Sequence, residues 1–593
     1  MGKNTYVADF ETTTKVDDCR VWMWGLYDLN NNKFSYGKDI DNFFDNVSKL
    51  PDKSTIYFHN LAFDGEFIFY YLFEKKGFTH TLERKLEDYE FSSLITRMGL
   101  FYSINVRINN KTFHFYDSYK IIPLAVSNIS EAFDITQLKG EIDYVKERPI
   151  GYIADSNEID YGKNDVEIVG KGLTKVFNQN LNKMTQASNA FWDFKKGLGK
   201  KNFERLFPLL NDIDAELRTS YKGGFTYCNP KYQGKTMGKG IVLDVNSLYP
   251  SVMYNSFLPY GEPILFEGQY KEDLVYNVYI QMIRCNFELK EGYLPTIQLK
   301  NSGFGFLPTD YVTSSDGQDI TICMTNVDLE LFMAHYNVYN IEYFTGWKFK
   351  SSNTIFRSYI DKWASVKEEA TITGNEGLRF IAKRMLVSLY GKFGTKRKIQ
   401  SNIPVYGEYL NKEGKLCGEP GIVKYVEGEE ELRDSIYLPV ASFVTAYGRQ
   451  KTISCAQKNY DTFMYADTDS LHLNTSEPPD NIDVDPIKLG YWKLEGNFNK
   501  AKFLRAKSYI EIMCITPEKW EKIKLKKQVN WKFNPSENMY EQSHVACAGL
   551  PTSCHKYITF ENFKDGVKIP GGLKRKRVKG GVVLLPFDFT IKL

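Results

Sequence analysis

The chain has 593 residues, 76 of them basic and 73 acidic, so its net charge is only +3. This length is too great for one hydrophobic core and predicts roughly two to four domains. Net charge gives no sign of a nucleic-acid partner, but basic tracts at 195–201, 522–527 and 574–579 lie among abundant Tyr and Phe. Such tracts suit phosphate neutralisation and base stacking, although a solvated face explains any one of them equally well.

Nine cysteines are scattered through the chain without a C-x-x-C pair, and no histidines stand at zinc-finger spacing. This pattern argues against a disulfide framework and a structural zinc site, and it favours a reducing compartment. The N-terminus lacks the pattern of a signal peptide, and no apolar run reaches membrane-spanning length. We therefore expect a cytoplasmic protein with no membrane partner.

Acidic residues recur in the first predicted elements. Asp9 and Glu11 share one face of a predicted strand over residues 5–12, and a second predicted strand runs into a turn that reaches Asp64. Two acids on one face are costly in a core. A solvated edge strand is nevertheless the commoner explanation of such a pair on its own.

A predicted helix over residues 158–169 carries Tyr161 and Asp165 four apart on one face. Together with the acids before it, this helix completes a set of four carboxylates and one tyrosine hydroxyl. Such a set suffices for hydrolysis of a phosphodiester with two cations about 3.5–4 Å apart, the hydroxyl orienting a water. The ordered recurrence favours this interpretation more than any single pair does.

The middle of the chain begins with a helical, basic stretch at 180–210 and then Tyr221-Lys222-Gly223-Gly224. Adjacent glycines permit unusual backbone conformations and close approach of a ligand, so a hinge or a backbone-lined contact is predicted, with an ordinary loop about as plausible. Residues 261–350 mix strand-like runs with Gly, Ser and Pro clusters and indicate an inserted subdomain.

Three further carboxylates stand at predicted strand ends. Asp244 ends the predicted apolar strand 240–244, and Asp467 and Asp469 lie at the tip of a strand-turn-strand hairpin. Clustered carboxylates repel one another unless a hard divalent cation lies between them, which suits phosphoryl transfer, although Asp-rich surface turns are common. Tyr249 could stack beneath a sugar and exclude a 2′-hydroxyl, or it could be a packed core residue.

A predicted helix over residues 377–391 places Lys383 and Tyr390 on one face. The Lys could reach a triphosphate and the Tyr could pack on a forming base pair, with added charge from Lys367 and Arg379. A solvated amphipathic helix gives much the same pattern.

Two strand features follow. Residues 400–427 predict a hairpin with its turn near 411–415, and residues 504–510 predict an alternating strand with Lys507 and Tyr509 on one face. That pair suits a contact to phosphate and to the minor-groove edge of a duplex, but a cross-strand surface pair is commoner.

Nine motifs occur in a fixed order along essentially the whole chain: DFET at 9–12, N-x-x-F-D at 60–64, YxxxD at 161–165, YxGG at 221–224, DxxSLYP at 244–250, KxxxVSLYG at 383–391, TxxGR at 445–449, YxDTDS at 465–470 and KxY at 507–509. In this order they resemble the protein-primed family B DNA polymerases of small bacteriophages, of the phi-twenty-nine type. The resemblance implies a multidomain chain of α/β and α+β class. It implies an RNase H-like 3′-5′ exonuclease domain, a right-hand polymerase of palm, fingers and thumb, and two inserted terminal-protein regions.

The resemblance also implies domain limits: exonuclease 1–180, palm 181–255 and 427–525, first inserted region 256–350, fingers 351–394, second inserted region 395–426 and thumb 526–593. Such enzymes replicate linear phage genomes processively from a terminal protein, with strand displacement. They bind primer-template and single-stranded DNA and deoxynucleoside triphosphates, and each active site uses two Mg²⁺ or Mn²⁺ ions. A monomer in the cytoplasm of an infected bacterial host is expected.

Carried over by position, the polymerase metals are held by Asp244, the carbonyl of Val245, Asp467 and Asp469. The nucleotide is bound by Tyr249, Lys367, Arg379, Lys383 and Tyr390. The exonuclease metals are held by Asp9, Glu11, Asp64 and Asp165, with Glu141 nearby, and hydrolysis is assisted by Lys139, Tyr144 and Tyr161. The single-stranded 3′ end is gripped by Thr12, Tyr57, His59, Asn60, Phe63 and Ser118. Further DNA contacts are implied for Tyr221, Gly223, Gly224, Thr445, Arg449, Lys507 and Tyr509.

The chain departs from the family pattern at two positions. Val387 stands where Asn is usual on the nucleotide-binding helix, which exchanges a hydrogen-bonding amide for an apolar group and places nucleotide handling in question. Glu141 stands where Asp is usual, which keeps the charge on a longer arm. A decayed polymerase half beside a working exonuclease, a non-catalytic DNA-binding protein and an oligonucleotide-primed polymerase are the alternatives.

Overall fold

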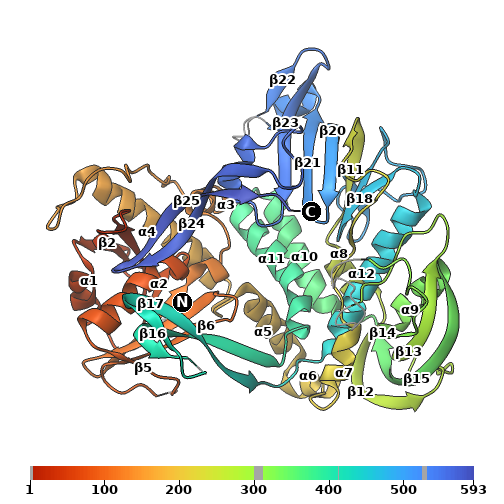
Figure 1. Ribbon diagram of the computed structural model, residues 1–593, viewed down its shortest axis with the longest axis horizontal. Helices are drawn as coiled ribbons and strands as arrows, with labels where there is room; N and C mark the ends of the chain where they lie inside the picture. Colours follow the sequence, from red (N-terminus) through yellow and green to blue (C-terminus); the bar gives the residue numbers. More distant parts are fainter. Residues whose placement is uncertain (1–3, 84, 300–310, 412, 524–530, 593) are drawn as a thin grey trace.

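A computed structural model describes residues 4–83, 85–299, 311–411, 413–523 and 531–592. Within these ranges the strands form three larger sheets and two separate hairpins (Figure 1). No helix in these ranges is both long and apolar enough to cross a membrane.

The N-terminal part of the chain folds into an eight-stranded mixed sheet in the order β3-β2-β1-β4-β8-β7-β6-β5. Strands β1, β4 and β8 run parallel at its centre. Helix α4 covers Val7 and Tyr57 on one face, and helices α1 and α2 cover Phe10 and Phe58 on the other, as is usual for parallel strands. The elements are β1 Thr5–Thr12, β2 Val21–Asp28, β3 Lys33–Gly37, α1 Ile40–Val47, β4 Ser54–Phe58, α2 Leu61–Tyr70, β5 Thr79–His80, β6 Glu90–Ile95, β7 Phe101–Ile108, β8 Lys111–Asp117, α3 Val126–Ala132 and α4 Ser156–Phe177.

The second sheet has nine strands in the order β22-β23-β21-β20-β11-β19-β18-β9, with β10 pairing β20. The predicted palm limit at 526 falls inside this sheet, because β23 pairs with β21. Its strands are β9 Thr226–Cys228, β10 Thr236–Met237, β11 Gly240–Val245, β18 Phe463–Asp467, β19 Ser470–Leu473, β20 Trp492–Arg505, β21 Ser508–Ile515, β22 Lys532–Asn534 and β23 Met539–Cys547.

Helices pack beside this sheet, with α10 and α11 forming an antiparallel pair (Figure 1). The helices of this half are α5 Gln186–Leu198, α6 Lys200–Leu206, α7 Asp214–Leu217, α8 Leu248–Asn255, α10 Arg357–Ile372, α11 Glu376–Phe393, α12 Leu438–Lys458 and α13 Pro517–Ile523.

A four-stranded sheet is inserted between α8 and α10, in the order β12-β15-β13-β14. It lies in the stretch where the sequence predicts an inserted subdomain, and it carries one helix of its own. Its elements are β12 Leu258–Glu267, β13 Val278–Leu289, β14 Ile320–Thr325, α9 Asn326–His335 and β15 Tyr336–Ser352. Part of the predicted Gly-, Ser- and Pro-rich stretch, residues 300–310, lies outside the described residues.

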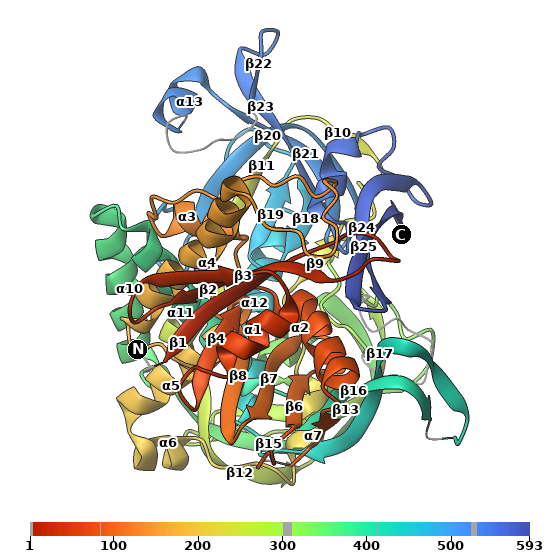
Figure 2. The same ribbon diagram turned by 90° about the vertical axis from the view of Figure 1, so that its left-hand side faces the viewer.

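Two hairpins from the C-terminal part of the chain reach the N-terminal sheet (Figures 1 and 2). The predicted hairpin at 400–427 is confirmed as β16 Lys398–Leu410 and β17 Leu416–Leu432, and the C-terminal hairpin pairs β24 Lys568–Val578 with β25 Gly581–Thr590. Val423 and Val583 are buried in the same core as Phe67 of α2. Apolar side chains therefore fix both hairpins against the N-terminal sheet.

One strand prediction is wrong. Residues 504–510 do not form a single strand, because β20 ends at Arg505 and β21 begins at Ser508. Lys507 turns the chain between them with a positive φ of 58°. The apolar alternation that suggested one strand comes from two antiparallel strands that meet at this turn.

Candidate active sites

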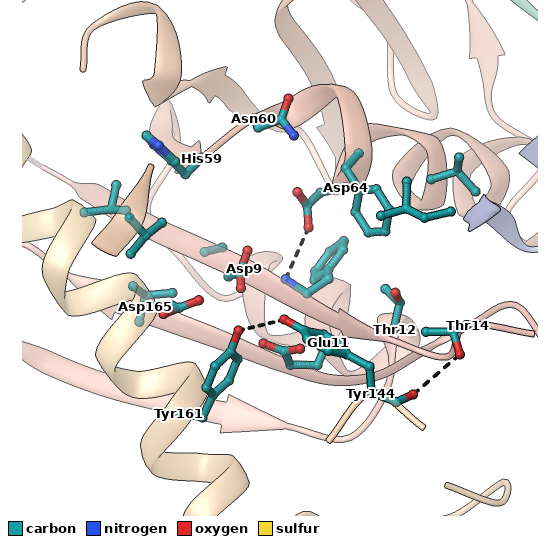
Figure 3. Close-up of a pocket in the computed structure, with 18 of the residues that line it drawn as sticks. Asp9, Glu11, Thr12, Thr14, His59, Asn60, Asp64, Tyr144, Tyr161 and Asp165 are labelled. Atoms are coloured by element: carbon teal, nitrogen blue, oxygen red, sulfur yellow. Dashed lines mark hydrogen bonds between the residues drawn. The ribbon is translucent and has the colours of Figure 1, made fainter. Parts of the chain in front are cut away.

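The first candidate site is a cavity of about 620 Å³ in the N-terminal domain, between β1, α2, α4 and the C-terminal hairpin. Four carboxylates line it (Figure 3). Asp9 and Glu11 come from β1, Asp64 from the first turn of α2, and Asp165 from α4. The structure thus brings together the predicted set, although its members lie far apart in the sequence.

Burial is the main influence on these carboxyl groups. Together with the Asp165 carboxylate it raises the pKa of Glu11 to about 8, and it raises the pKa of Asp64 to about 7. The pKa of Asp9 is raised well above its usual value by burial and by Asp64. Crowded, desolvated carboxylates of this kind are stabilised when a cation lies between them.

The donor set suits a divalent cation, because hard cations prefer carboxylate oxygens. The Oδ1 atom of Asp165 is buried and has no hydrogen-bond partner within the described ranges, so it is available as a ligand. As the side chains stand, no three His, Cys, Asp or Glu residues of the described chain are already arranged around one metal position.

Two predicted assisting residues enter the cavity from the segment before α4. Lys139 donates from Nζ to Asp165 Oδ2 over 2.5 Å. The Tyr144 and Tyr161 hydroxyls are hydrogen-bonded at 2.9 Å (Figure 3). Burial raises the pKa of Tyr161, so its hydroxyl stays protonated and can orient a water.

Four of the predicted single-strand contacts, Thr12, His59, Asn60 and Phe63, line the same cavity. His59 Nε2 is 2.7 Å from the carbonyl of Leu124, and burial lowers the pKa of this imidazole. Asn60 takes a positive φ of 77° just before α2, which turns the chain toward the cavity.

Three predicted residues of this site lie elsewhere. Ser118 is buried beneath the cavity, where its Oγ is 2.9 Å from His59 Nδ1, so it holds the imidazole in place. Tyr57 packs on Phe177 in the core and does not line the cavity. Glu141 is exposed and also does not line it.

The C-terminal hairpin supplies one wall of the cavity, which sequence reasoning missed. Leu573, Val582 and Leu584 line that wall, and Arg575 Nη2 donates to Asn60 Oδ1 over 3.2 Å. The only sign of this wall in the sequence is the basic tract beside an apolar strand at the end of the chain. No local pattern indicates that this tract contacts residue 60.

The second candidate site lies on the nine-stranded sheet. Asp244 ends β11 directly opposite Ser470 of β19, while Asp467 ends β18. Thr468 makes the tight turn with a positive φ of 64°, and Val245 N donates to Asp469 O over 2.8 Å. Asp244, Asp467 and Asp469 therefore meet at one end of three neighbouring strands.

The three carboxyl groups differ in their surroundings. Burial and the nearby Asp469 carboxylate raise the pKa of Asp244 to about 7, and burial also raises the pKa of Asp469. Asp467 instead accepts hydrogen bonds from Lys507 Nζ at 2.9 Å and from Thr226 Oγ1 at 3.0 Å. These carboxylate oxygens also suit a divalent metal ion. The turn at Lys507 brings the positive charge of that side chain to Asp467.

The predicted nucleotide residues gather around this site. The Tyr249 and Tyr390 rings are in contact with centroids 4.2 Å apart. Burial lowers the pKa of Lys367, and the neighbouring Lys383 and Arg379 cations lower it further, so three positive charges lie close together on α10 and α11. Val387, the departure from the family pattern, is half-buried on the same helix.

Of the two glycines in the predicted YxGG motif, Gly224 is required by close packing rather than by its backbone angles, whereas a Cβ atom on Gly223 would meet no atom within 4 Å. Neither glycine has a positive φ, so the hinge interpretation is not needed. A Cβ atom on Gly224 would lie 2.9 Å from the Tyr249 hydroxyl and 2.7 Å from Thr468, so only glycine allows this approach. Gly223 is exposed and Tyr221 is half-buried in the same loop.

Two residues predicted to contact DNA are enclosed in the protein. Arg449 is 2% exposed and donates to both carboxylate oxygens of Asp328 and to the carbonyl of Gly223. Thr445 is 1% exposed and donates to the carbonyl of Ala441. The expectation of direct DNA contact is corrected here, because neither side chain is exposed: Arg449 fixes the glycine loop, and Thr445 is hydrogen-bonded within its own helix. Tyr509 is half-buried with its ring 5.0 Å from Tyr465.

Comparison with known proteins gives consistent results. The family model for DNA polymerase type B, organellar and viral, matches residues 46–156 and 135–486. The chain is 42% identical to the DNA polymerase of Bacillus phage phi29 over all of both chains, and 32% identical to that of Streptococcus phage Cp-1 over 99% of this chain and 98% of the relative.

Solved structures agree with these relatives. Phi29 DNA polymerase complexed with primer-template DNA and incoming nucleotide substrates is similar with a TM-score of 0.89 and 40% identity, over 99% of this chain and 100% of that one. The same enzyme complexed with single-stranded DNA gives a TM-score of 0.87 at the same identity and coverage.

Proposed function

Because the chain belongs to the organellar and viral type B DNA polymerases, we propose that it replicates a linear phage genome by protein-primed, strand-displacing synthesis and proofreads with a 3′-5′ exonuclease. It has the multidomain fold of such enzymes, an exonuclease domain beside a palm, fingers and thumb. The observation that carries the proposal is the presence of two separate carboxylate clusters, one in the N-terminal cavity and one at the Asp467 hairpin.

At the hairpin site, Asp244, Asp467, Asp469 and the carbonyl of Val245 would hold two Mg²⁺ or Mn²⁺ ions. These ions would lower the pKa of the primer 3′-hydroxyl and neutralise the triphosphate and the leaving pyrophosphate. Lys383, whose charge acts on both Asp244 and Asp469, binds the phosphates together with Lys367 and Arg379, whose charges lie near it. Tyr390 packs on the new base pair, and Tyr249 beside it excludes a 2′-hydroxyl.

In the N-terminal cavity the carboxylates would hold a second pair of ions, which would activate a water on a frayed 3′ end. Tyr161 and Tyr144 orient that water through their paired hydroxyls. Lys139 keeps Asp165 in place by its 2.5 Å contact. The single strand lies along Thr12, Asn60 and Phe63, which line the cavity.

The relatives' solved complexes suggest the partners: primer-template DNA, single-stranded DNA and incoming nucleotides. The four-stranded inserted sheet and the β16–β17 hairpin are our candidates for contacts with a terminal priming protein and for strand displacement. We propose a monomer that works in the cytoplasm of an infected bacterium. The complete set of carboxylates at the Asp467 hairpin weighs against a decayed polymerase half.

A mispaired primer tests the two activities together. We expect the purified chain with Mg²⁺ to shorten a primer with a mismatched 3′ end and then to extend it when deoxynucleotides are present. A chelator should stop both reactions. Extension without any shortening of the mismatched end would contradict the exonuclease assignment.

A further inference from the structure

The segment from Lys139 to Tyr152 carries both assisting residues of the N-terminal cavity, yet it contains no helix or strand, and all of it is described. Apolar packing anchors it only weakly, because Val145 is 86% exposed and Ile150 is 89% exposed, while Tyr152 at its end packs on the ring of Trp22. The position of this segment therefore depends largely on polar contacts.

Arg148 donates four hydrogen bonds, more than any other side chain of this fully described segment. It is 6% exposed, and its guanidinium lies 4.2 Å from the ring of Trp22 on β2. Nε and Nη2 donate to Glu158 Oε1 over 3.1 and 2.9 Å. Nη2 also donates to the carbonyl of Asp143 over 2.8 Å, and Nη1 to that of Lys146 over 3.2 Å. One side chain thus ties the segment to itself, to β2 and to α4.

Glu158 is a fixed partner, because it also closes the first turn of α4. Its Oε2 accepts from the backbone N–H of Asp155 over 3.0 Å, and its own N–H donates to Asp155 Oδ1 over 3.0 Å, which forms a capping box. Tyr161 and Asp165 follow on the same helix. The anchor of the segment and two residues of the cavity therefore belong to one rigid element.

We propose that Arg148 is a positioning residue for the exonuclease: it holds the 139–152 segment against α4 so that Lys139 reaches Asp165 and Tyr144 reaches Tyr161. Arg148 does not line the cavity. The planar, forked guanidinium of Arg148 stacks on a ring and donates hydrogen bonds to three acceptors at the same time. The ammonium of a Lys cannot do this. This inference rests on the proposed exonuclease activity.

The test compares variants of the full chain on a 5′-labelled single-stranded oligonucleotide with Mg²⁺. We expect Arg148→Met to lower kcat for degradation by on the order of 10- to 100-fold with little change in KM, since small misplacements of catalytic groups cost this much. Primer extension should stay within about twofold of wild type. Amide hydrogen exchange over residues 139–152 should become faster.

A double-mutant cycle separates positioning from general destabilisation. If Arg148 acts through Lys139, then Arg148→Met combined with Lys139→Met should degrade DNA no more slowly than Lys139→Met alone. In Arg148→Met the Glu158 carboxylate keeps, among the described residues, only Lys146 Nζ at 3.1 Å and the Tyr152 hydroxyl at 2.7 Å as side-chain partners. Adding Glu158→Gln removes this less well compensated buried charge and keeps the capping box, so it should recover part of the lost melting temperature but not degradation. Lys15→Met is the matched control, because it breaks the exposed Lys15–Glu147 ion pair of the same segment and should change neither activity.

The inference would be overturned if Arg148→Met degraded DNA at the wild-type rate. It would also be overturned if the rate losses of Arg148→Met and Lys139→Met multiplied in the double variant. If Arg148→Met also loses primer extension, Arg148→Lys provides the test, since it keeps the charge and loses the fork; normal degradation by that variant would equally refute the role. A wild-type chain that extends primers but degrades no DNA would instead show that the proposed exonuclease is wrong, and the inference would fall with it.

Discussion

Individual carboxyl groups in the two sites are stabilised in different ways. Asp467 is paired with Lys507, so its charge has a partner even without a metal. Glu11 and Asp64 are desolvated beside other carboxylates, which raises their pKa values to about 8 and about 7. Without metal, the N-terminal cavity should therefore retain protons at neutral pH, and so should Asp244 of the hairpin site, whose pKa is raised to about 7 by burial and by Asp469.

The first residue-scale prediction concerns Asp467→Asn, which keeps the shape of the side chain and removes its charge. Loss of a metal ligand is worth several kcal/mol in the transition state, so primer extension should fall by roughly 10³-fold or more. Degradation of single-stranded DNA should be unchanged. Single-nucleotide incorporation and 3′ shortening measure the two effects.

The reciprocal control is Asp9→Ala combined with Asp64→Ala, which should abolish shortening and leave incorporation intact. An Asp467→Asn protein that still extends primers at a normal rate would remove Asp467 from the metal site.

The second residue-scale prediction concerns pH. In the metal-free protein Glu11 and Asp64 bind protons more tightly when folded than when unfolded, so stability from these groups is complete below their ordinary pKa values near 4 and is lost as pH rises to about 8. The melting temperature of metal-free protein should fall between pH 5 and pH 8. Mg²⁺ competes with these protons, so it should raise the melting temperature more at pH 8 than at pH 5.

The variant Asp9→Ala with Asp64→Ala should lose much of both the pH dependence and the metal effect. A metal-free melting temperature that rises over this pH range would contradict the burial of these carboxylates.

At the scale of elements, the β16–β17 hairpin is anchored at its base and free at its tip. Tyr406 stacks on Phe73 of the N-terminal domain with centroids 5.7 Å apart and planes at 13°. Val423, which pairs with Tyr406 across the hairpin, is buried in the same core. Leu410 and Leu416 near the tip are 69% and 60% exposed. Such an arm can contact DNA or a partner without disturbing the sheet below it.

The hairpin prediction removes the arm and keeps the anchor. Replacing residues 407–422 with Asn-Gly joins the paired Tyr406 and Val423 by a two-residue turn. We expect normal extension on a single-stranded template and at least about tenfold less synthesis through a downstream blocking strand. Equal displacement by the shortened protein would show that the hairpin has no part in it.

At the scale of the whole molecule, three segments that are distant in the sequence meet at one ion pair. Arg577 on β24 donates to Glu66 on α2 over 2.8 Å, and its guanidinium lies 4.4 Å from the ring of Tyr425 on β17. Glu66 is 3% exposed. One side chain thus joins both hairpins to the N-terminal domain, in addition to the apolar side chains that fix them there.

Arg577→Met should loosen this junction, because it leaves a buried carboxylate unpaired. The Arg577 side chain is 43% exposed, so we expect a local loss of only about 1–3 kcal/mol. Amide exchange over residues 568–590 should become on the order of 10-fold faster or more. Adding Glu66→Gln should restore most of the protection; unchanged exchange in Arg577→Met would show that apolar packing alone holds the hairpin.

The sequence predicted both carboxylate clusters because their members stand at strand ends and on one helix face, where local spacing determines direction. It could not predict that Arg449 is enclosed by Asp328, since that contact spans the inserted sheet. The sequence predicts Lys507 within a single strand, because two short antiparallel strands and one longer strand show the same alternation of apolar and polar residues. The wall that the C-terminal hairpin adds to the N-terminal cavity could not be predicted either, because it depends on tertiary packing alone.

The most direct test of the central claim, two metal-dependent sites in one chain, is extension of a 5′-labelled primer on a template with a downstream blocking strand. With Mg²⁺ and deoxynucleotides the account predicts long products made through the block, and without deoxynucleotides it predicts progressive shortening of the same primer. Shortening without any extension would contradict the polymerase half of the account, and Val387→Asn would be the first variant to examine.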